Sequence, residues 1–274
     1  MNRRLPIWPI LLMLVSSCGQ NYWLGVYQGQ IKQGTAAIAA AKTDRERAAG
    51  YDQRARGYAD KARYLRFFKK TSLEEYLRLF DQAMRDHAEA LRLDPAGADR
   101  YASRGVTCYE RVYAGPPDNP LPKEEADKYS ALAKADFSKA IELDARHELA
   151  LDRRGMIEEQ ERDYDAAIRD YTAELAVNEK LAKLRLAEAY CERGDYLRGR
   201  KKNEPAIEDY QRSIAFDMPP DSCSCDPYGS LAGTYYEAGR YDEAWAAVRE
   251  AQAKRRWLPP EFIEQLKKTS GRSG

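Results

Sequence analysis

The chain has 274 residues, enough for one large domain or for an array of repeats. Its 45 basic and 44 acidic residues leave a net charge of +1, which gives no support to nucleic-acid binding, since that would need a basic face. Charged residues make up 32% of the chain and Tyr occurs 19 times, a composition that favours exposed helices around thin cores over one deep core.

The first residues have the order of a bacterial export signal. Arg3 and Arg4 precede a short apolar run, IWPILLMLV at 7–15. This run is shorter than the roughly 20 apolar residues that span a bilayer, and it is typical of the core of a signal peptide. The sequence VSSC at 15–18 follows, and it resembles a lipobox, in which an aliphatic residue and two small residues precede a cysteine.

The lipobox resemblance implies cleavage before Cys18 and acylation of that cysteine. Residues 1–17 are then a lipoprotein signal peptide, and residues 18–42 are a lipid anchor and tether. Several acyl chains together give stable membrane anchoring. Lipoproteins retained at the inner membrane carry Asp after the cysteine, whereas this chain has Gly19, so we expect a protein lipid-anchored at the periplasmic face of the bacterial outer membrane. The alternative is a plain signal peptide and a periplasmic protein without lipid.

The rest of the chain repeats one helical pattern. DYDAAIRDYTAEL at 163–175 has counterparts at 79–91 and 203–215. Small residues align in five first helices and in five second helices. Those of the first helices are Gly57, Gly105, Gly155, Gly194 and Ala232, and those of the second helices are Ala83, Ala133, Ala167, Ala206 and Ala244. The shortest spacings, 12 residues within a repeat and 22 to the next, give a period of 34 residues.

This pattern resembles the tetratricopeptide repeat, most clearly in YGSLAGTYYEAGRYDEAWAAVREA at 228–251. The resemblance implies an all-α, right-handed superhelical solenoid of about five helix pairs over 43–256, with a capping helix and tail in 257–274. The expected repeats are about 43–97, 98–147, 148–186, 187–224 and 225–256. The capping boxes TDRE at 43–46 and SLEE at 72–75 predict helix starts at Thr43 and Ser72.

Packing between the helices follows from the same alignment. Phe137, Tyr171 and Tyr210 are expected to fill the space beside the next repeat. An arginine precedes the aligned glycine in four repeats, and an aspartate precedes each of the three aromatic residues. We interpret these residues as structural ion pairs rather than a site; the arginines are Arg56, Arg104, Arg154 and Arg193, and the aspartates are Asp136, Asp170 and Asp209. The insertion at 63–80 lengthens both helices of repeat one or, alternatively, exposes a docking patch.

Little in the sequence points to catalysis. His87 occupies an aromatic position of the repeat and is expected to fill the core, and no metalloprotease, nucleophile-elbow or phosphate-loop motif occurs. We therefore expect no enzyme, no cofactor and no metal site. An oxidising compartment favours a disulfide from Cys191 to Cys223 or Cys225, with Cys108 as a buried free thiol. The alternative function is a periplasmic thiol, redox or metal factor that uses Cys223 and Cys225.

The family resemblance places a binding groove along the first helices. The residues expected to line it are Asp99, Tyr109, Glu110, Asp152, Met156, Glu159, Glu188, Asp195, Asp226, Tyr236 and Glu237. Acidic residues dominate this set, which predicts a basic peptide or protein partner; the alternative is that they are ordinary solvated acids. Repeat one differs, with Arg54 and Lys61 beside Tyr51 and Tyr58. Related chaperone-binding proteins grip a carboxylate with Lys and Asn, and the acids here argue against that mode.

The sequence thus predicts a non-enzymatic scaffold or adaptor, held at the outer membrane through Cys18, that binds a protein or peptide in an acidic groove. The resemblance suggests an envelope assembly or a cell-wall complex as its setting.

Overall fold

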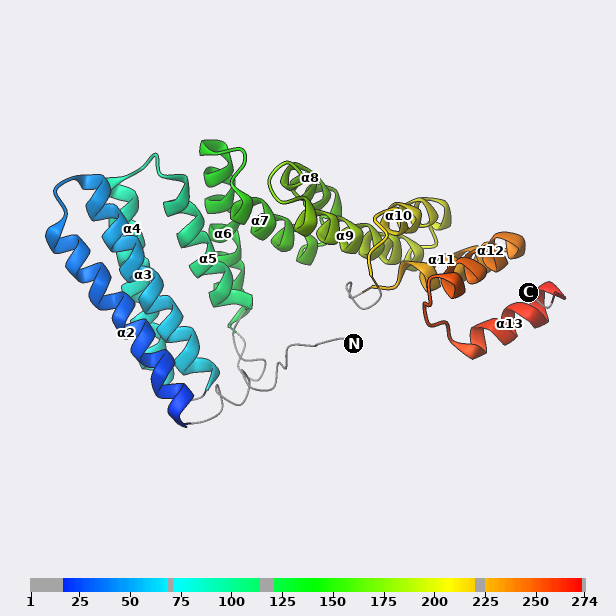
Figure 1. The fold of residues 1–274 in the computed structure, drawn as a ribbon, viewed down its shortest axis with the longest axis horizontal. Coiled ribbons are helices and arrows are strands. Elements are labelled where there is room, and N and C mark those ends of the chain that lie inside the picture. Colours follow the sequence, from blue (N-terminus) through cyan, green and yellow to red (C-terminus); the bar gives the residue numbers. More distant parts are fainter. Residues whose placement is uncertain (1–16, 69–70, 114–120, 220–224, 273–274) are drawn as a thin grey trace, which may run out of the picture. The chain divides into compact units, whose positions relative to one another are not determined.

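The computed structural model describes residues 17–68, 71–113, 121–219 and 225–272, all of whose regular secondary structure is helical (Figure 1). The chain divides into two compact halves, residues 1–150 and 151–274. The helices are α2 (Ser17–Ala40), α3 (Asp44–Phe67), α4 (Leu73–Leu93), α5 (Ala98–Tyr113), α6 (Lys123–Leu143), α7 (Glu148–Gln160), α8 (Tyr164–Glu174), α9 (Glu179–Gly199), α10 (Asn203–Ala215), α11 (Pro227–Glu237), α12 (Tyr241–Ala253) and α13 (Pro260–Ser270). The predicted signal peptide, apart from Ser17, lies outside the described residues.

The helices form the predicted pairs. The first helices of the five repeats are α3, α5, α7, α9 and α11, and the second helices are α4, α6, α8, α10 and α12. Thr43 caps α3 with a complete capping box, and Ser72 caps α4 by accepting a hydrogen bond from the Glu75 N–H, so both predicted starts are confirmed. The expected all-α chain of helix pairs is confirmed as well.

A ring from the second helix lies on a glycine of the first helix in repeats two to four. A Cβ added to Gly105 would lie 2.7 Å from Phe137, one on Gly155 would lie 2.5 Å from Tyr171, and one on Gly194 would lie 2.6 Å from Tyr210. All three rings are fully buried. Each ring therefore occupies the hollow that the missing Cβ leaves within its own repeat. Tyr171 also belongs to one buried cluster with Leu186 and Ala189 of α9, and Tyr210 to one with Leu231 of α11, so the predicted packing beside the next repeat is confirmed for these two rings.

A bidentate arginine–aspartate pair flanks each of these contacts. Arg104 donates to Asp136 at 2.8 and 2.7 Å, Arg154 to Asp170 at 2.7 and 2.6 Å, and Arg193 to Asp209 at 2.7 Å through both nitrogens. The aspartates are buried, so each pair satisfies a carboxylate that would otherwise be costly to bury. The predicted structural ion pairs are confirmed in these three repeats.

Repeat one uses a different register from the predicted one. Arg54, not Arg56, pairs with the aspartate before the aromatic position, at 2.7 Å from each oxygen of Asp86. Ala55 therefore holds the place of the packing glycine, and it is fully buried against Ala83. Gly57 instead faces α2, where an added Cβ would lie 2.9 Å from Ile31.

Residues 18–42 also differ from the predicted tether. They lie mostly within α2, a 24-residue helix that packs along α3. Glycines permit this close approach: an added Cβ would lie 2.7 Å from the backbone of Arg54 at Gly34, and 2.8 Å from the backbone of Ile38 at Gly50. The segment is helical because its Gln, Ala and Ile residues have α3 to pack against.

At the other end of the array, α13 covers the last repeat. Leu266 is fully buried in the cluster that includes Trp245, and Phe262 and Ile263 pack against the same cluster. The Trp245 Nε1–H donates to Ser270 at 3.1 Å. This is the arrangement expected of a capping helix.

Substitution of Gly155 by alanine tests the ring-on-glycine contact. The new methyl group must displace Tyr171, so we expect urea unfolding to show a loss of about 1–2 kcal/mol, the overpacking cost less the helix propensity gained. Gly199→Ala is the control, because nothing lies within 4 Å of a Cβ at that helix position. It should leave stability unchanged or raise it; an equal response of the two variants would contradict the contact's role.

Candidate functional site

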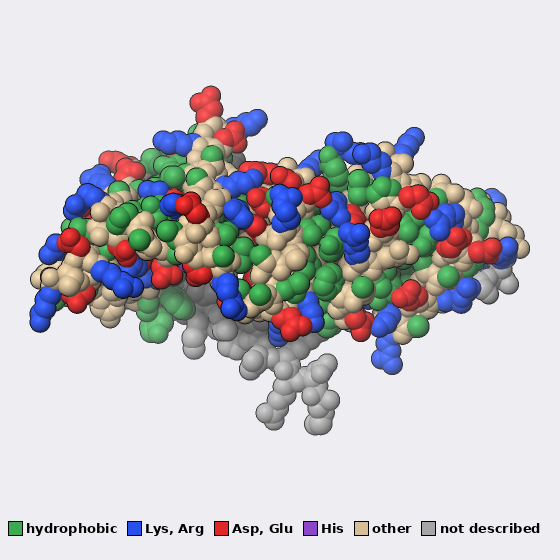
Figure 2. All heavy atoms as spheres, turned by 90° about the horizontal axis from the view of Figure 1, so that it is seen from above, with side chains coloured by type: hydrophobic (Ala, Val, Ile, Leu, Met, Phe, Trp, Pro, Cys, Tyr) green, Lys and Arg blue, Asp and Glu red, His purple; other side chains and the backbone are tan. Residues whose placement is uncertain are grey.

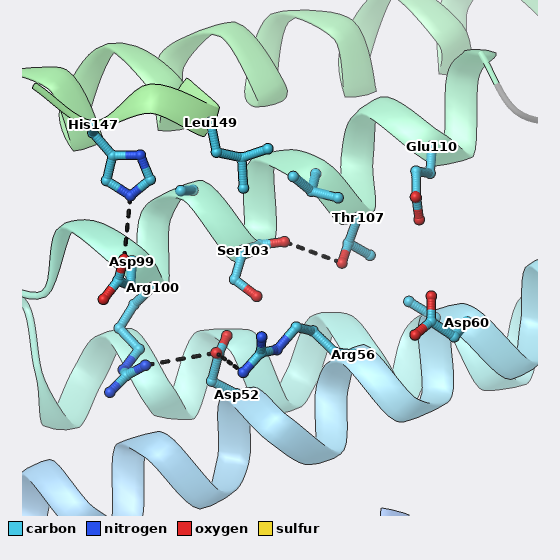
Figure 3. A pocket seen from close by; sticks show the side chains of 13 residues that line it. Asp52, Arg56, Asp60, Asp99, Arg100, Ser103, Thr107, Glu110, His147 and Leu149 are labelled. Carbon is cyan, nitrogen blue, oxygen red and sulfur yellow. Dashed lines mark hydrogen bonds and ion pairs between the residues drawn. The ribbon is translucent and has the colours of Figure 1, made fainter. Parts of the chain in front are cut away.

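A pocket of about 300 Å³ opens between the first helices of repeats one and two in the N-terminal half (Figure 3). Its α3 wall comprises Asp52, Arg56, Ala59 and Asp60, and its α5 wall comprises Asp99, Arg100, Ala102, Ser103, Val106, Thr107 and Glu110. His147 and Leu149 close one end. Small side chains along α3 and α5 keep the space between the two helices open.

The base of the pocket is a buried carboxylate, that of Asp52, which is 2% exposed. Arg56 approaches it at 3.2 Å, Arg100 at 3.6 Å and the His87 Nδ1 at 3.4 Å. Burial alone would raise the pKa of Asp52, but His87, Arg56 and the Ser103 hydroxyl outweigh it, so the pKa is lowered. Asp52 is therefore a fixed negative charge that holds two arginines at the pocket floor.

The two ends of the pocket carry further acids. At one end, His147 Nε2 lies 3.3 Å from an oxygen of Asp99, whose side chain is 87% exposed. At the other end, Asp60 and Glu110 both contact Arg63. Burial raises the pKa of Asp60, against the opposing effect of Arg63 and Arg56. Figure 3 shows Asp60 and Glu110 together, away from the His147–Asp99 pair.

Two of the three groove residues predicted in this half line the pocket. Asp99 and Glu110 belong to its wall, whereas Tyr109 is 9% exposed, belongs to the core and does not line it. The α3 wall was missed, because the repeat-one register was taken from Gly57. The spacing could have revealed it: Arg54 and Asp86 are 32 residues apart, as are Arg104 and Asp136.

In the C-terminal half, acidic side chains gather on the first helices α7 and α9. Burial raises the pKa of Glu159 to about 7, assisted by the charges of Glu192 and Glu188 and opposed by a hydrogen bond from the Tyr171 hydroxyl at 3.3 Å. Burial also raises the pKa of Glu192, with further contributions from Glu188 and Asp195. Glu192 was not among the predicted groove residues. Mutual repulsion in a partly buried setting means that this face favours a positive ligand.

Asp195 has a structural role beside this face. It accepts hydrogen bonds from the Tyr210 hydroxyl at 2.7 Å and from Ser230 at 3.1 Å. It thereby joins α9 to α10 and α11. Removal of its charge would disturb the repeat contact as well as the surface potential.

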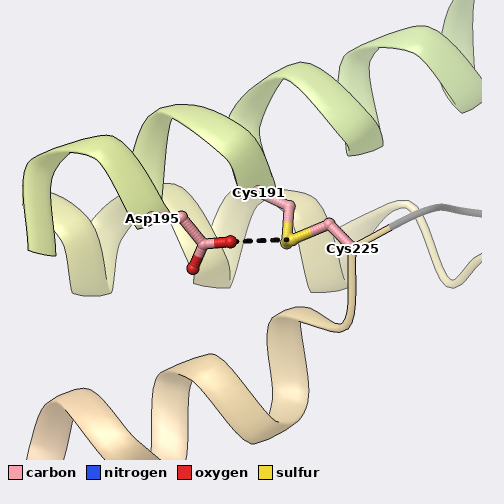
Figure 4. A group of neighbouring side chains, drawn as sticks. All are labelled: Cys191, Asp195 and Cys225. Atoms are coloured by element: carbon pink, nitrogen blue, oxygen red, sulfur yellow. Dashed lines mark hydrogen bonds between the residues drawn. A yellow bond between two sulfur atoms is a disulfide. The ribbon is translucent and has the colours of Figure 1, made fainter. Parts of the chain in front are cut away.

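A disulfide lies next to Asp195 and joins Cys191 of α9 to Cys225, just before α11 (Figure 4). The Cα atoms are 6.2 Å apart. Of the two partners predicted for Cys191, Cys225 is the bonded one, while Cys223 lies outside the described residues. An Asp195 oxygen is 3.5 Å from the Cys225 sulfur, but only that carboxylate remains as a metal donor while the sulfurs are bonded.

The other predicted groove residues serve contacts within the half. Asp152 is 5% exposed and accepts from Arg185 at 2.8 Å, and the same arginine lies 3.3 Å from the Met156 sulfur. Asp226 caps α11 through the Tyr228 and Gly229 N–H groups. Glu237 pairs with Arg198 at 3.1 Å.

Tyr236 is covered by the capping helix. Its ring lies 5.9 Å from that of Phe262, and its hydroxyl is bonded to Gln265 and Thr269. These contacts come from α13, which was predicted as a capping helix without any indication that it would reach Tyr236.

The buried cysteine and histidine outside these surfaces carry no accessible reactive group. Burial raises the pKa of Cys108 to about 12, which keeps its thiol protonated and unreactive. His87 is fully buried and bonds Thr107 at 2.9 Å, in agreement with the predicted core role. Over the face seen in Figure 2, lysine and arginine side chains lie among aspartates and glutamates.

Glu159→Gln tests the strained carboxyl. The pKa of Glu159 is higher in the folded chain than in the unfolded chain, so the folded state binds the proton more tightly. The stability that this adds is complete below the ordinary pKa of a glutamate and is lost as the pH rises through about 7. The variant should exceed the wild type in unfolding free energy by about 1–3 kcal/mol near pH 8, and the difference should vanish near pH 4. Denaturant melts across this range measure it, with exposed Glu208→Gln as control. A difference that is constant with pH would contradict the assignment.

No family model matches the chain, and no curated protein matches it. Solved structures that resemble it include the MamA protein, at 21% identity over 73% of this chain and 91% of that one, with a TM-score of 0.44. BtubC from P. vanneervenii is 14% identical over 86% of this chain and 91% of that one, with a TM-score of 0.48. A tetratricopeptide repeat protein from Parabacteroides merdae is 15% identical over 89% of this chain and 86% of that one, with a TM-score of 0.40.

At these levels of similarity the assignment depends on the chain's own repeat geometry. Repeats two to four share the ring-on-glycine contact and the arginine–aspartate pair, and repeat one carries the pair beside Ala55. The described residues therefore form an all-α fold of the tetratricopeptide-repeat type.

Proposed function

We propose that this chain is a non-enzymatic scaffold that binds a basic peptide or protein on its first-helix face. The observation that carries the proposal is the excess of acids on that face. In the C-terminal half, Glu159 and Glu192 have raised pKa values because they are partly buried near other carboxylates. A lysine or arginine from a partner would relieve this repulsion and so add to affinity and specificity.

The pocket in the N-terminal half supports the same function. It is open, it is lined at repeat-equivalent positions of α3 and α5, and it contains Asp60, Asp99 and Glu110 around the Asp52 floor. Its arginines and acids can both take part in hydrogen bonds to an extended peptide. Known tetratricopeptide folds present binding surfaces of this kind along their first helices.

We further propose that the chain acts at the periplasmic face of the outer membrane, anchored by lipid on Cys18, in an envelope assembly or cell-wall complex. The support is the order of basic residues, apolar run and VSSC in the sequence. Among the described residues, no helix is both long and apolar enough to cross a membrane.

The acidic face is tested by reversing two of its charges. Glu188→Lys with Glu192→Lys should reduce crosslinked recovery of a specific partner from the native host's envelope by roughly tenfold or more, since close opposite charges become like charges. These positions are preferable to Asp152 and Asp195, which hold the fold together through Arg185 and Tyr210.

Glu208→Lys with Glu250→Lys is the matched control. Both residues are exposed and lie on the second helices α10 and α12, so the net charge changes equally while the first-helix face is kept. Circular dichroism confirms that both double variants are folded. Equal recovery of the partner with the two variants would reject the acidic face as its binding site.

The lipid anchor is tested by Cys18→Ser in the full-length chain expressed in the native host. We expect the wild type to stay with the membrane after a carbonate wash and the variant to be released, because several acyl chains are needed for stable anchoring. Mass spectrometry of the N-terminal peptide detects the acyl groups directly. An unmodified N-terminus at Cys18 would rule out the lipid anchor.

A further inference from the structure

Aromatic side chains form a continuous group at one end of the α2–α3 hairpin. We call this group the aromatic tip, and it comprises Tyr22, Trp23, Tyr27, Tyr64, Phe67 and Phe68. Successive ring centroids lie 4.7–6.2 Å apart, from Tyr22 at the start of α2 to Phe67 at the end of α3. Figure 1 shows that the first turns of α2 and the last turn of α3 lie at the same end of the hairpin.

Part of this group is left uncovered. Tyr22 is 66% exposed and Phe67 is 64% exposed, and Leu73 at the start of α4 is 53% exposed. Tyr64 is buried beneath them, so the exposed rings have a packed base. Large apolar side chains exposed together mark an interaction surface.

The two helices of the tip differ in charge. Residues 5–31 contain no Asp, Glu, Lys or Arg, and the first charged residue of α2 is Lys32. The carboxylate of Glu75, in the first turn of α4, is paired with Arg78 at 2.7 Å. The α2 side of the tip is therefore uncharged, whereas its α3 side carries Arg63 and Arg66, and Lys69 and Lys70 follow in the sequence, so anionic lipid should strengthen the interaction.

Cys18 lies one helical turn before Tyr22 within α2, about 6 Å along the helix axis. Any acyl chain on Cys18 would hold this end of the hairpin against the bilayer surface. Trp and Tyr rings favour that layer, since each has an apolar body and a polar group that can remain hydrated. A protein partner would have to occupy the same layer as the lipid.

We propose that the aromatic tip is a membrane-docking surface, in which the rings of Tyr22, Trp23 and Phe67 enter the headgroup region of the bilayer. This proposal rests on the proposed lipid anchor at Cys18, which supplies most of the affinity for the membrane. The tip adds a second contact that fixes the orientation of the α2–α3 hairpin on the membrane.

The test uses the unacylated chain from residue 18 to 274 with Cys18→Ser, so that lipid on the protein plays no part. Flotation with vesicles of phosphatidylethanolamine and phosphatidylglycerol, and with vesicles of phosphatidylcholine alone, gives the partition coefficients. We expect weak binding to both, and stronger binding to the vesicles that contain phosphatidylglycerol. Tyr22→Ser with Phe67→Ser should lower the partition coefficient by roughly tenfold, because interfacial binding scales with buried apolar area.

Trp257→Ser is the matched control. Trp257 is 73% exposed, but it precedes α13 in the other half of the molecule, so its loss should leave the partition coefficient unchanged. Brominated lipids should quench the tryptophan fluorescence of the vesicle-bound protein. The Trp23→Phe variant should lose that quenching, which assigns the inserted ring.

Three results would overturn the proposal. The first is no vesicle binding by the unacylated chain, and the second is an equal loss of the partition coefficient in the Trp257→Ser control. The third is self-association in sedimentation that disappears with Tyr22→Ser and Phe67→Ser while vesicles remain unbound. The last result would make the tip a contact between copies of the chain. This assay uses neither the acidic face nor the acyl group, so its failure leaves those two proposals standing, and their failure leaves this one testable.

Discussion

The register of each helix pair depends on how one residue of the second helix lies against a small residue of the first. In repeats two to four this is a ring on a glycine, and a bidentate arginine–aspartate pair stands beside it, as between Arg154 and Asp170. The ring fixes the distance between the helices, and the ion pair fixes their relative shift. Removing one partner of such a pair would leave a buried charge, which typically costs about 3–5 kcal/mol. A one-residue slip would break both contacts at once.

This register also decides which side chains remain available for a partner. With Ala55 and Gly105 as the packing positions, Arg56 and Val106 occupy equivalent places on α3 and α5, and both line the pocket. The arginines of the flanking pairs are already engaged, so they do not neutralise the acids of the first-helix face. Burial raises the pKa values of Glu159 and Glu192, and the neighbouring carboxylates add to the effect.

The sequence was sufficient for the parts of the fold that repeat. Gly155 and Gly194, with their neighbouring arginines, predicted the helix pairs and their ion pairs. Repeat one was misaligned because Gly57 was taken as the residue that packs against the second helix of the repeat. The absence of a side chain at Gly57 instead allows α2 to approach closely near Ile31. The groove was predicted less well. Tyr236 faces the first-helix side by spacing, but α13 covers it, and no local pattern specifies where a terminal helix docks.

The two ends of the array are closed in different ways. A capping helix of a soluble repeat protein needs a polar outer face. α13 fits this requirement, with Lys267 and Lys268 in its last turn and Leu266 beneath. α2 differs in its first turns: it has no charge before Lys32, and Tyr22 projects from it. The exposed positions farther along α2 include Gln28, Lys32, Gln33 and Thr35, so the apolar surface is confined to its first turns. These uncharged turns are the ones that contain Cys18 and lie nearest to it along α2, so the proposed acyl anchor and the exposed rings would meet the same bilayer surface.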